Sequence, residues 1–239
     1  MRKMLIPILL IIMMGACNKS TDNTQADASQ VQQEWMVIFD GHSTEALRGY
    51  GIDEFPQGVW YVENGVLIAN PDTANRDLIT KARFKDFELV YEWAVDTASN
   101  SGVFFHMQED LSMVADHGNS PNWLENFEIQ VLDDLNFHDT LSNRSAGALY
   151  DLMAPTNKQL KPIGEFNQAR LIHRDGHVEH WLNGNKVLEF EIDSPEMKDL
   201  LASSNFKENP DYHSDEEGHI MFQHHGQKVY YRNIKVREL

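Results

Sequence analysis

The sequence predicts an all-β protein, a jelly-roll sandwich of two antiparallel sheets with one short helix. Many short runs alternate apolar and polar residues, as half-buried strands do. Turn pairs such as Asn64-Gly65, Asp175-Gly176 and Asn183-Gly184 separate several of these runs, and such a pair between apolar runs is a strong hairpin signal. The length of 239 residues also fits one sandwich, because single all-β domains of roughly 200–250 residues are ordinary.

The first predicted strands lie before residue 96. Candidate strands occupy residues 35–39, closed by the turn pair Asp40-Gly41, then residues 60–62 and 66–69, and a short run at 77–80. Residues 87–95 are long and strictly alternating, with Phe87, Leu89, Tyr91 and Trp93 on one side. A helix is the competing interpretation of that run, but its aromatic residues favour a strand.

The stretch from residue 100 to 150 holds the polar side chains that most suggest a site. In residues 127–134, Phe127, Ile129 and Val131 point to one side of a strand, while Glu128 and Gln130 point to the other. Residues 100–106 repeat this arrangement and end with His106, on the same side as Gly102 and Phe104. If both runs lie in one curved sheet, we expect their polar sides to face a common groove.

The remaining chain predicts further strands and the helix. Candidate strands are residues 168–174, 177–182, 186–192, 219–224 and 229–236. The helix signal is at residues 194–201, where Ser194 can cap, Pro195 takes the first helical position and Glu196 suits the positive end of the dipole. Residues 111–126 and 205–217 are predicted loops, the first of them overhanging the groove.

The N-terminus has the order of a secretory signal. Arg2 and Lys3 precede an apolar run at residues 4–14, which is shorter than the ~20 residues of a membrane-spanning helix. The phrase Met14-Gly15-Ala16-Cys17 resembles a bacterial lipobox, in which the cysteine is lipidated. We therefore expect a lipoprotein signal peptide at 1–16, a flexible tether at 17–34 and a folded domain at 35–239, anchored through Cys17 on the periplasmic side or surface of a bacterial membrane. An ordinary secretory peptide or a plain membrane anchor is the alternative.

Composition limits the partners. The net charge of -17 argues against tight binding to nucleic acid, because that affinity comes from Lys and Arg displacing phosphate counterions. Neutral ligands, cations or metal ions suit an acidic chain, although charge of this size also serves solubility. Cys17 is the single cysteine, so no internal disulfide can form.

Several phrases occur together and in a fixed order. They are Phe39-Asp40-Gly41, Trp60 to Leu67, Asn100 to Phe105, Phe127 to Asp133, Gly147 to Tyr150, Lys161 to Asn167, Trp181 to Gly184, Gln223 to Gly226 and Tyr231 to Ile234. In this combination the chain resembles the 3-keto-disaccharide hydrolase family from about residue 35 to residue 239. The resemblance implies a concanavalin A-like jelly roll that acts on glycosides oxidised at C3 of the sugar, beside a separate sugar 3-oxidoreductase that makes the ketone.

The chain departs from the family pattern in a few places. Phe166 stands where Trp is usual, and His106 stands where many members carry Arg. The loops at 111–126 and 205–217 also look individual. These departures bear on substrate choice more than on fold.

The chemistry implied by the resemblance requires three kinds of group. A ketone at C3 acidifies the hydrogen on C2, so cleavage by elimination needs a base near C2, a donor or metal for the enolate oxygen, and an acid for the leaving group. Glu128 is the candidate base or metal ligand, and Glu92 is the alternative carboxylate from a neighbouring strand. His106 and His225 are candidates for the acid, the enolate donor or a ligand.

Other side chains are of the types that bind sugars. Gln130, Asp133, Asn183 and Gln223 suit hydroxyl groups, Lys161 and Arg232 suit a ketone or enolate oxygen, and Trp123 and Tyr150 can stack on a sugar ring. Each type also has a structural interpretation, since polar residues stabilise turns, cations pair with surface acids and aromatics fill cores. The cofactor requirement stays open: a divalent metal ion is compatible with the His and carboxylate content, but no dense ligand motif or nicotinamide fingerprint is present.

Two alternative functions stay open beside the lyase-type hydrolase. One is a non-catalytic carbohydrate-binding lectin of the same fold, because fold alone does not decide activity. The other is a conventional two-carboxylate glycosidase, which needs paired carboxyl groups ~5–9.5 Å apart. Glu128 is followed two residues on by Gln130 rather than an acid, which weakens this second alternative.

Overall fold

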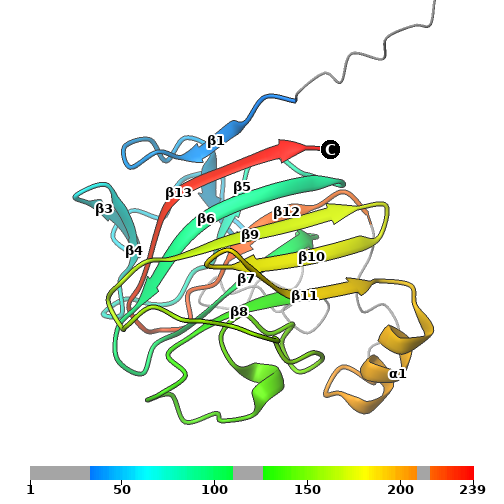
Figure 1. The fold of residues 1–239 in the computed structure, drawn as a ribbon. Helices are drawn as coiled ribbons and strands as arrows, with labels where there is room; N and C mark the ends of the chain where they lie inside the picture. The colour runs from blue at the N-terminus through cyan, green and yellow to red at the C-terminus, as the bar shows by residue number, and fades with distance from the viewer. Residues whose placement is uncertain (1–32, 110–125, 209–215) are drawn as a thin grey trace, which may run out of the picture. The chain divides into compact units, whose positions relative to one another are not determined.

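Two antiparallel sheets packed against each other make up the fold in a computed structural model that describes residues 33–109, 126–208 and 216–239 (Figure 1). Sheet A has the order β11 (Asn185–Glu191), β10 (His177–Leu182), β9 (Asn167–Arg174), β6 (Phe87–Val95), β13 (Val229–Glu238), β4 (Val66–Ala69) and β3 (Trp60–Glu63), with β1 (Met36–Phe39) also paired to β13. Sheet B has the order β2 (Leu47–Gly49), β5 (Leu78–Thr80), β12 (His219–Phe222), β7 (Asn100–Met107) and β8 (Glu128–Leu132). The predicted all-β jelly-roll sandwich is confirmed.

The hairpins form where the turn pairs predicted them. Asn64 and Gly65 join β3 to β4, with φ angles of 51° and 78°. Asp175-Gly176 joins β9 to β10, and Asn183-Gly184 joins β10 to β11, again with positive φ at both positions. Asn, Asp and Gly tolerate this left-handed conformation, which matches the twist of the flanking strands.

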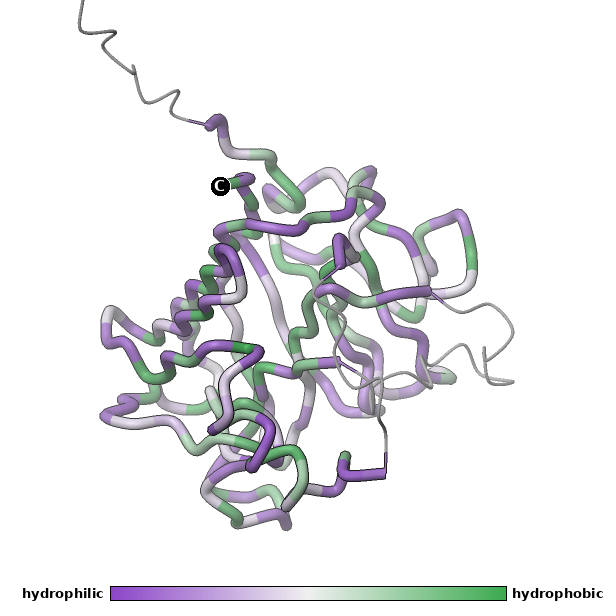
Figure 2. The backbone as a smooth tube through the Cα atoms, turned by 90° about the vertical axis from the view of Figure 1, so that its right-hand side faces the viewer, coloured by the Kyte–Doolittle hydropathy of each residue, from purple (hydrophilic) through white to green (hydrophobic). Residues whose placement is uncertain are grey.

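The hydrophobic core lies between the sheets. Along β6, Phe87, Leu89, Tyr91 and Trp93 are at most 2% exposed and belong to one cluster with Ile129 and Val131 of β8. The strict alternation along β6 therefore predicted its buried side, and Figure 2 shows the same alternation of hydrophobic and hydrophilic residues along the strands. Burial of each such side chain contributes about 1.5–3 kcal/mol.

The predicted helix is confirmed as α1 (Pro195–Ser203), the one α-helix in the described residues. Ser194 Oγ accepts a hydrogen bond from the backbone N–H of Met197 at 3.1 Å, which caps the N-terminus. Met197 is buried and fixes the helix to the core. A 3-10 turn, η3 (Ser142–Arg144), lies in the loop after β8.

A bulge in β7 changes the direction of His106. Met107 pairs with His219 and Phe104 with Met221, so Phe105 and His106 together face Ile220. His106 has φ of 57°, is fully buried and lies 4.4 Å from His173 of sheet A, measured between ring centroids. The prediction that His106 shares a side with Gly102 and Phe104 is wrong, because the extra residue turns the imidazole into the core.

No helix among residues 33–109, 126–208 and 216–239 combines the length and the apolar character needed to cross a membrane. The predicted signal peptide, Cys17, nearly all of the predicted tether and Trp123 lie outside the described residues. The same holds for almost all of the predicted loop at 111–126 and for part of the loop at 205–217.

Candidate functional site

A polar row crosses the outer face of sheet B, the face turned away from the core. Phe222 pairs with Leu78 and with Val103, and Gly102 pairs with Gln130. Asp77 directly precedes β5 and Gln223 directly follows β12. The register therefore aligns Asp77, Gln223, Gly102 and Gln130 on four adjacent strands, although these residues are far apart in the sequence.

Glu128 leans across this row above Gly102. A Cβ atom added to Gly102 would lie 2.0 Å from Glu128 Oε1 and 2.6 Å from Glu128 Cδ. The carboxyl group thus occupies the space that a side chain at position 102 would fill. Glycine is needed at position 102 because the Glu128 carboxyl group comes close to the backbone there, and not because the backbone has an unusual angle.

The Glu128 carboxyl group is buried and has no charge partner. The residue is 6% exposed, and no hydrogen bond or ion pair reaches its carboxyl oxygens from the described residues. Burial raises the pKa of Glu128, and the negative charge of Asp77 raises it further, to about 8. A carboxyl group that titrates near neutral pH can serve as either a general acid or a general base.

Three amide oxygens beside Glu128 are also buried and lack a hydrogen bond within the described part of the chain: Asn100 Oδ1, Gln130 Oε1 and Gln223 Oε1. Gln130 Nε2 donates to the carbonyl oxygen of Arg144 at 3.2 Å, which orients its amide. Buried polar atoms in folded proteins are normally paired with protein, water or a ligand, so these oxygens are available as hydrogen-bond acceptors. We refer to Glu128, Asp77, Asn100, Gln130 and Gln223 as the Glu128 cluster.

Asp77 was not among the predicted site residues. It is 3% exposed, and its Oδ1 accepts the backbone N–H of His224 at 2.7 Å. His224 Nε2 in turn lies 3.1 Å from the carbonyl oxygen of Asn70. Asp77 carries no motif of its own, and only the non-local pairing of β5 with β12 brings it to Glu128.

His225 and Tyr150 flank the cluster. His225 lies two residues beyond Gln223, and its exposed ring is 6.3 Å from Phe137 in the loop that follows β8. The backbone N–H of Tyr150 donates to the carbonyl oxygen of Glu128 at 2.9 Å, and the Arg144 guanidinium lies 5.6 Å from the Tyr150 ring. Tyr150 therefore contacts the backbone of Glu128 directly, whereas His225 lies next to the loop that follows the other end of β8.

Glu92 and Arg232 lie in the other sheet. Glu92 is on the outer face of β6, where its carboxylate accepts hydrogen bonds from Arg232 Nε and Asn233 Nδ2, both at 2.8 Å. The prediction that Glu92 comes from a strand neighbouring that of Glu128 is wrong, because the chain changes sheets between β6 and β7. Arg232 pairs with a surface acid, as its structural interpretation predicts.

Asp133 and Asn183 stabilise loops. The Asp133 carboxylate accepts hydrogen bonds from the backbone of Ala98 and Leu135 and from the backbone and side chain of Asn136. Although burial opposes it, these hydrogen bonds lower the pKa of Asp133. Asn183 binds Gln159, Asn167 and Gln168 from its hairpin turn.

Lys161 is exposed and lines a separate pocket of about 540 Å³ together with Leu135 and Ile163. Its backbone N–H donates to Asn167 Oδ1 at 2.9 Å, so its main chain is fixed while its ammonium group faces solvent. Lys161 therefore lies outside the Glu128 cluster.

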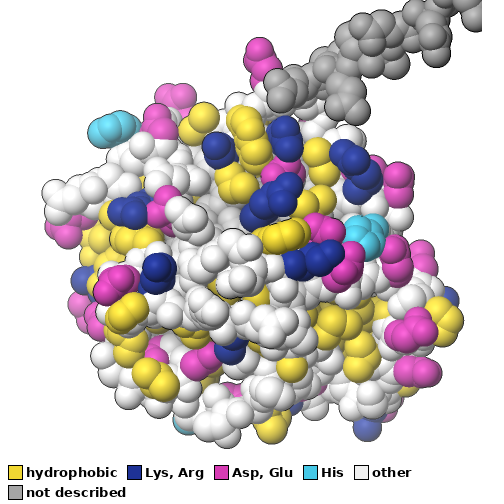
Figure 3. Space-filling view, in the orientation of Figure 1, with side chains coloured by type: hydrophobic (Ala, Val, Ile, Leu, Met, Phe, Trp, Pro, Cys, Tyr) yellow, Lys and Arg dark blue, Asp and Glu magenta, His cyan; other side chains and the backbone are white. Residues whose placement is uncertain are grey.

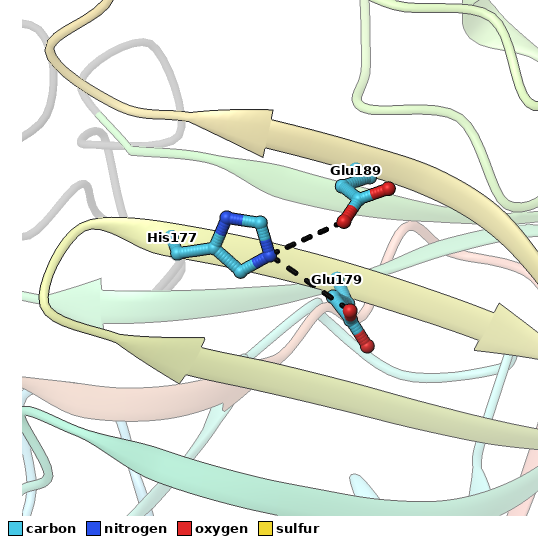
Figure 4. A group of neighbouring side chains, drawn as sticks. All are labelled: His177, Glu179 and Glu189. Carbon is cyan, nitrogen blue, oxygen red and sulfur yellow. Dashed lines mark ion pairs between the residues drawn. The ribbon is translucent and has the colours of Figure 1, made fainter.

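One group of His and acidic side chains among the described residues could converge on a metal ion: His177, Glu179 and Glu189, on sheet A (Figure 4). Lys186 Nζ already lies 3.2 Å from Glu179 and 2.7 Å from Glu189, and His177 Nδ1 lies 2.6 Å from Glu191. The group is an ion-pair network in which Lys186 and His177 offset part of the charge of three carboxylates. The carboxylate and amide oxygens of the Glu128 cluster are the donors that hard divalent cations prefer.

The fold is a β-sandwich of the jelly-roll class, an architecture that includes lectin domains, and one of its sheet faces carries carboxyl and amide groups. Residues 34–237 match the model of the 3-keto-alpha-glucoside-1,2-lyase-like domain. The chain belongs to this family, which confirms the resemblance seen in its sequence.

A named relative and two solved structures agree with this assignment. A 3-keto-disaccharide hydrolase of Bacteroides thetaiotaomicron is 34% identical over 249 aligned positions, which cover 93% of this chain and 85% of that protein. A crystal structure from Parabacteroides distasonis, provisionally described as a glycosyl hydrolase, has a TM-score of 0.75 at 29% identity and covers 86% of this chain and 94% of its own. A second such structure from the same organism has a TM-score of 0.63 at 26% identity, covering 86% and 100%.

Proposed function

We propose that this protein cleaves the glycosidic bond of 3-keto-glycosides by elimination followed by addition of water, with Glu128 as the base. Family membership and the named relative support a glycosidase-type enzyme that acts on carbohydrate. The observation that carries the proposal is the unpaired, buried Glu128 carboxyl group with a pKa of about 8. Such a group is a suitable base for a weakly acidic C–H bond.

The reaction divides into two steps. Ionised Glu128 takes the proton from C2, the electron pair moves toward the C3 ketone as an enolate, and the C1–O bond to the leaving group then breaks. Water adds to C1 of the resulting enone, and a proton returns to C2. The sum of both steps is hydrolysis, and the ketone at C3 is unchanged at the end.

The other members of the cluster have supporting roles in this proposal. The unpaired oxygens of Asn100, Gln130 and Gln223 accept hydrogen bonds from sugar hydroxyl groups and fix the ring above Glu128. His225, with its exposed imidazole, supplies the proton for the leaving oxygen or a hydrogen bond to the enolate. His106 has no such role, because it is buried in the core.

Partners and location follow from the substrate and the N-terminal sequence. The ketone at C3 must be made before cleavage, so a separate sugar 3-oxidoreductase is the proposed functional partner. Cys17 is the proposed lipid anchor that places the enzyme on the periplasmic side or surface of a bacterial membrane. Globomycin-sensitive processing and mass spectrometry of the mature N-terminus would test the anchor separately.

The test compares a glucoside with its 3-keto form, each with and without chelator. We expect release of the aglycone from the keto form only, and loss of release in Glu128→Gln. Glu92→Gln is the matched control, because it removes a carboxylate from sheet A and should leave turnover unchanged. Full activity of a folded Glu128→Gln protein would overturn the proposed role of Glu128.

One observation favours a second candidate, a conventional two-carboxylate glycosidase. Glu128 has an acidic neighbour in Asp77, whose charge raises its pKa, although Gln130 and not an acid stands two residues after Glu128 in the sequence. In that case the unoxidised glucoside would be cleaved, and Asp77→Asn would abolish turnover. In the elimination mechanism Asp77→Asn lowers the pKa of Glu128 and moves the alkaline rise of kcat/KM to lower pH. Binding of either sugar without release would indicate a lectin.

A further inference from the structure

A groove of about 730 Å³ lies on the outer face of sheet A, on the opposite side of the sandwich from the Glu128 cluster. Its floor includes Val90 of β6 and Gln168 of β9, and its sides include Trp181 of β10, Val37 of β1 and Lys235 of β13. Figure 3 shows Lys and Arg side chains beside hydrophobic ones over this part of the sheet. The proposed reaction uses none of these residues.

Trp181 is a fixed aromatic platform at one side of the groove. Its indole Nε1 donates to Glu179 Oε2 at 2.8 Å, and the Arg170 guanidinium and Lys186 ammonium lie 5.8 and 5.9 Å from its ring centre. These contacts set the orientation of the ring, while Trp181 itself stays partly exposed. The apolar face of a sugar can stack on such a ring without first having to order it.

The polar side chains of the groove suit hydroxyl groups. Gln168 is exposed, and its side-chain amide makes no hydrogen bond within the described residues. Glu92 and Asn233 present a carboxylate and an amide that already bind each other at 2.8 Å. A sugar hydroxyl group both donates and accepts hydrogen bonds, so it can bind either a carboxylate or an amide.

The charge of the lining favours a neutral ligand. Two carboxylates, Asp40 and Glu92, stand against two cations, Arg170 and Lys235. The molecule as a whole carries a net charge of -17, which repels polyanions. An extended peptide is a poor occupant, because the strands beneath the groove already pair with each other and offer no free sheet edge.

We propose that this groove is a second carbohydrate-binding site, which holds a neutral saccharide on the face of the molecule opposite the Glu128 cluster. A site in this position does not contact the bond that is cleaved. It holds the enzyme on a longer glycan while Glu128 remains free to act. The proposal stands on the geometry of sheet A and does not require the elimination mechanism.

The experiment is native gel electrophoresis of the domain in gels that contain laminarin, dextran or xyloglucan, with a gel lacking polysaccharide as reference. The Glu128→Gln background removes turnover. We expect at least one neutral polymer to retard this protein, and Trp181→Ala to weaken the apparent affinity roughly tenfold or more. Gln168→Ala, which truncates an exposed side chain, is the second variant and should also weaken retardation.

The control is Tyr230→Ala, which removes an aromatic ring from the same face of sheet A but outside the groove. It should leave retardation unchanged, and thermal unfolding should show that all variants fold. Turnover of a small 3-keto-disaccharide by Trp181→Ala in the otherwise wild-type chain should be unaffected. The proposal is overturned if no neutral polymer retards the protein, if only polygalacturonate or heparin does, or if Trp181→Ala and Gln168→Ala leave retardation unchanged.

Discussion

At the scale of single residues, Glu128 is held in a state that costs folding free energy. Burial and the charge of Asp77 raise its pKa from the ordinary 4.5 to about 8, and no cation compensates within the described residues. Other buried acids are treated differently: the Glu88 carboxylate is paired with both Arg170 and Arg237. An uncompensated acid of this kind fits the role proposed for Glu128, since active sites commonly give up stability for activity.

The cost of Glu128 predicts a pH-dependent stabilisation by Glu128→Gln. The raised pKa of Glu128 in the folded state makes the wild-type protein less stable as pH rises from 4.5 to about 8. Between these pH values the unfolded chain has released a proton that the folded chain retains. At about 1.4 kcal/mol per pKa unit, the loss amounts to a few kcal/mol at pH 9. Thermal unfolding should show a gain for Glu128→Gln at pH 9 and little gain at pH 5.

Glu92→Gln is the control for that comparison, since it removes an acid that is paired with Arg232 and should not give a gain that grows with pH. Equal effects of Glu128→Gln at both pH values would show that Glu128 is not held protonated in the folded protein.

Gly102 offers a second test at this scale. The added methyl group of Gly102→Ala would lie 2.0 Å from Glu128 Oε1, so the carboxyl group must move away from its place above β7. We expect a fall in kcat of about tenfold to a hundredfold, since small misplacements of a catalytic group cost rates of that order. Steady-state kinetics on a folded variant measures this, and an unchanged kcat would mean that the position of Glu128 above Gly102 does not matter.

At the scale of strands and loops, local signals predicted more than pairing did. Asn-Gly and Asp-Gly pairs located three hairpins, and alternation identified the outward Glu128 and Gln130. Alternation cannot show an extra residue in a strand, so it placed His106 on the wrong side of the β7 bulge. Strand pairing across the whole chain brings Asp77 close to Glu128 and places Glu92 in the other sheet. No local sequence pattern contains that information.

The β7 bulge makes His106 a structural residue. Its ring is fully buried against Phe87, Phe105 and His173, and its Nε2 lies 2.8 Å from the carbonyl oxygen of Lys85. We expect His106→Ala to cost about 2–5 kcal/mol of unfolding free energy, as other large-to-small core substitutions do. Denaturant unfolding measures this cost, and turnover per folded molecule should stay close to that of the wild type.

His225→Ala is the matched counterpart. Its ring is exposed, so the substitution should leave stability nearly unchanged and should reduce turnover. The reverse pattern, with His106→Ala inactive though folded, would return His106 to the catalytic mechanism.

At the scale of the whole molecule, the core separates the face proposed for catalysis from the face proposed to bind saccharide. Sheet B presents the Glu128 cluster on one outer face, and sheet A presents the groove lined by Trp181 on the other. The strand patterns and the resemblance together predicted the architecture. Only the resemblance indicated an enzyme, because strand patterns do not distinguish a lectin from an enzyme of the same fold. The proposed reaction therefore involves only the outer face of sheet B.

The most direct test of the account is the kinetic isotope effect at C2. A 3-keto-glucoside carrying deuterium at C2 is compared with the protium form, because only removal of the C2 proton distinguishes elimination from direct displacement at C1. If Glu128 removes this proton, kcat/KM should be clearly higher for the protium form. Glu128→Gln should cleave neither form. Equal kcat/KM for the two forms, with normal cleavage of the C1–O bond, would contradict the account.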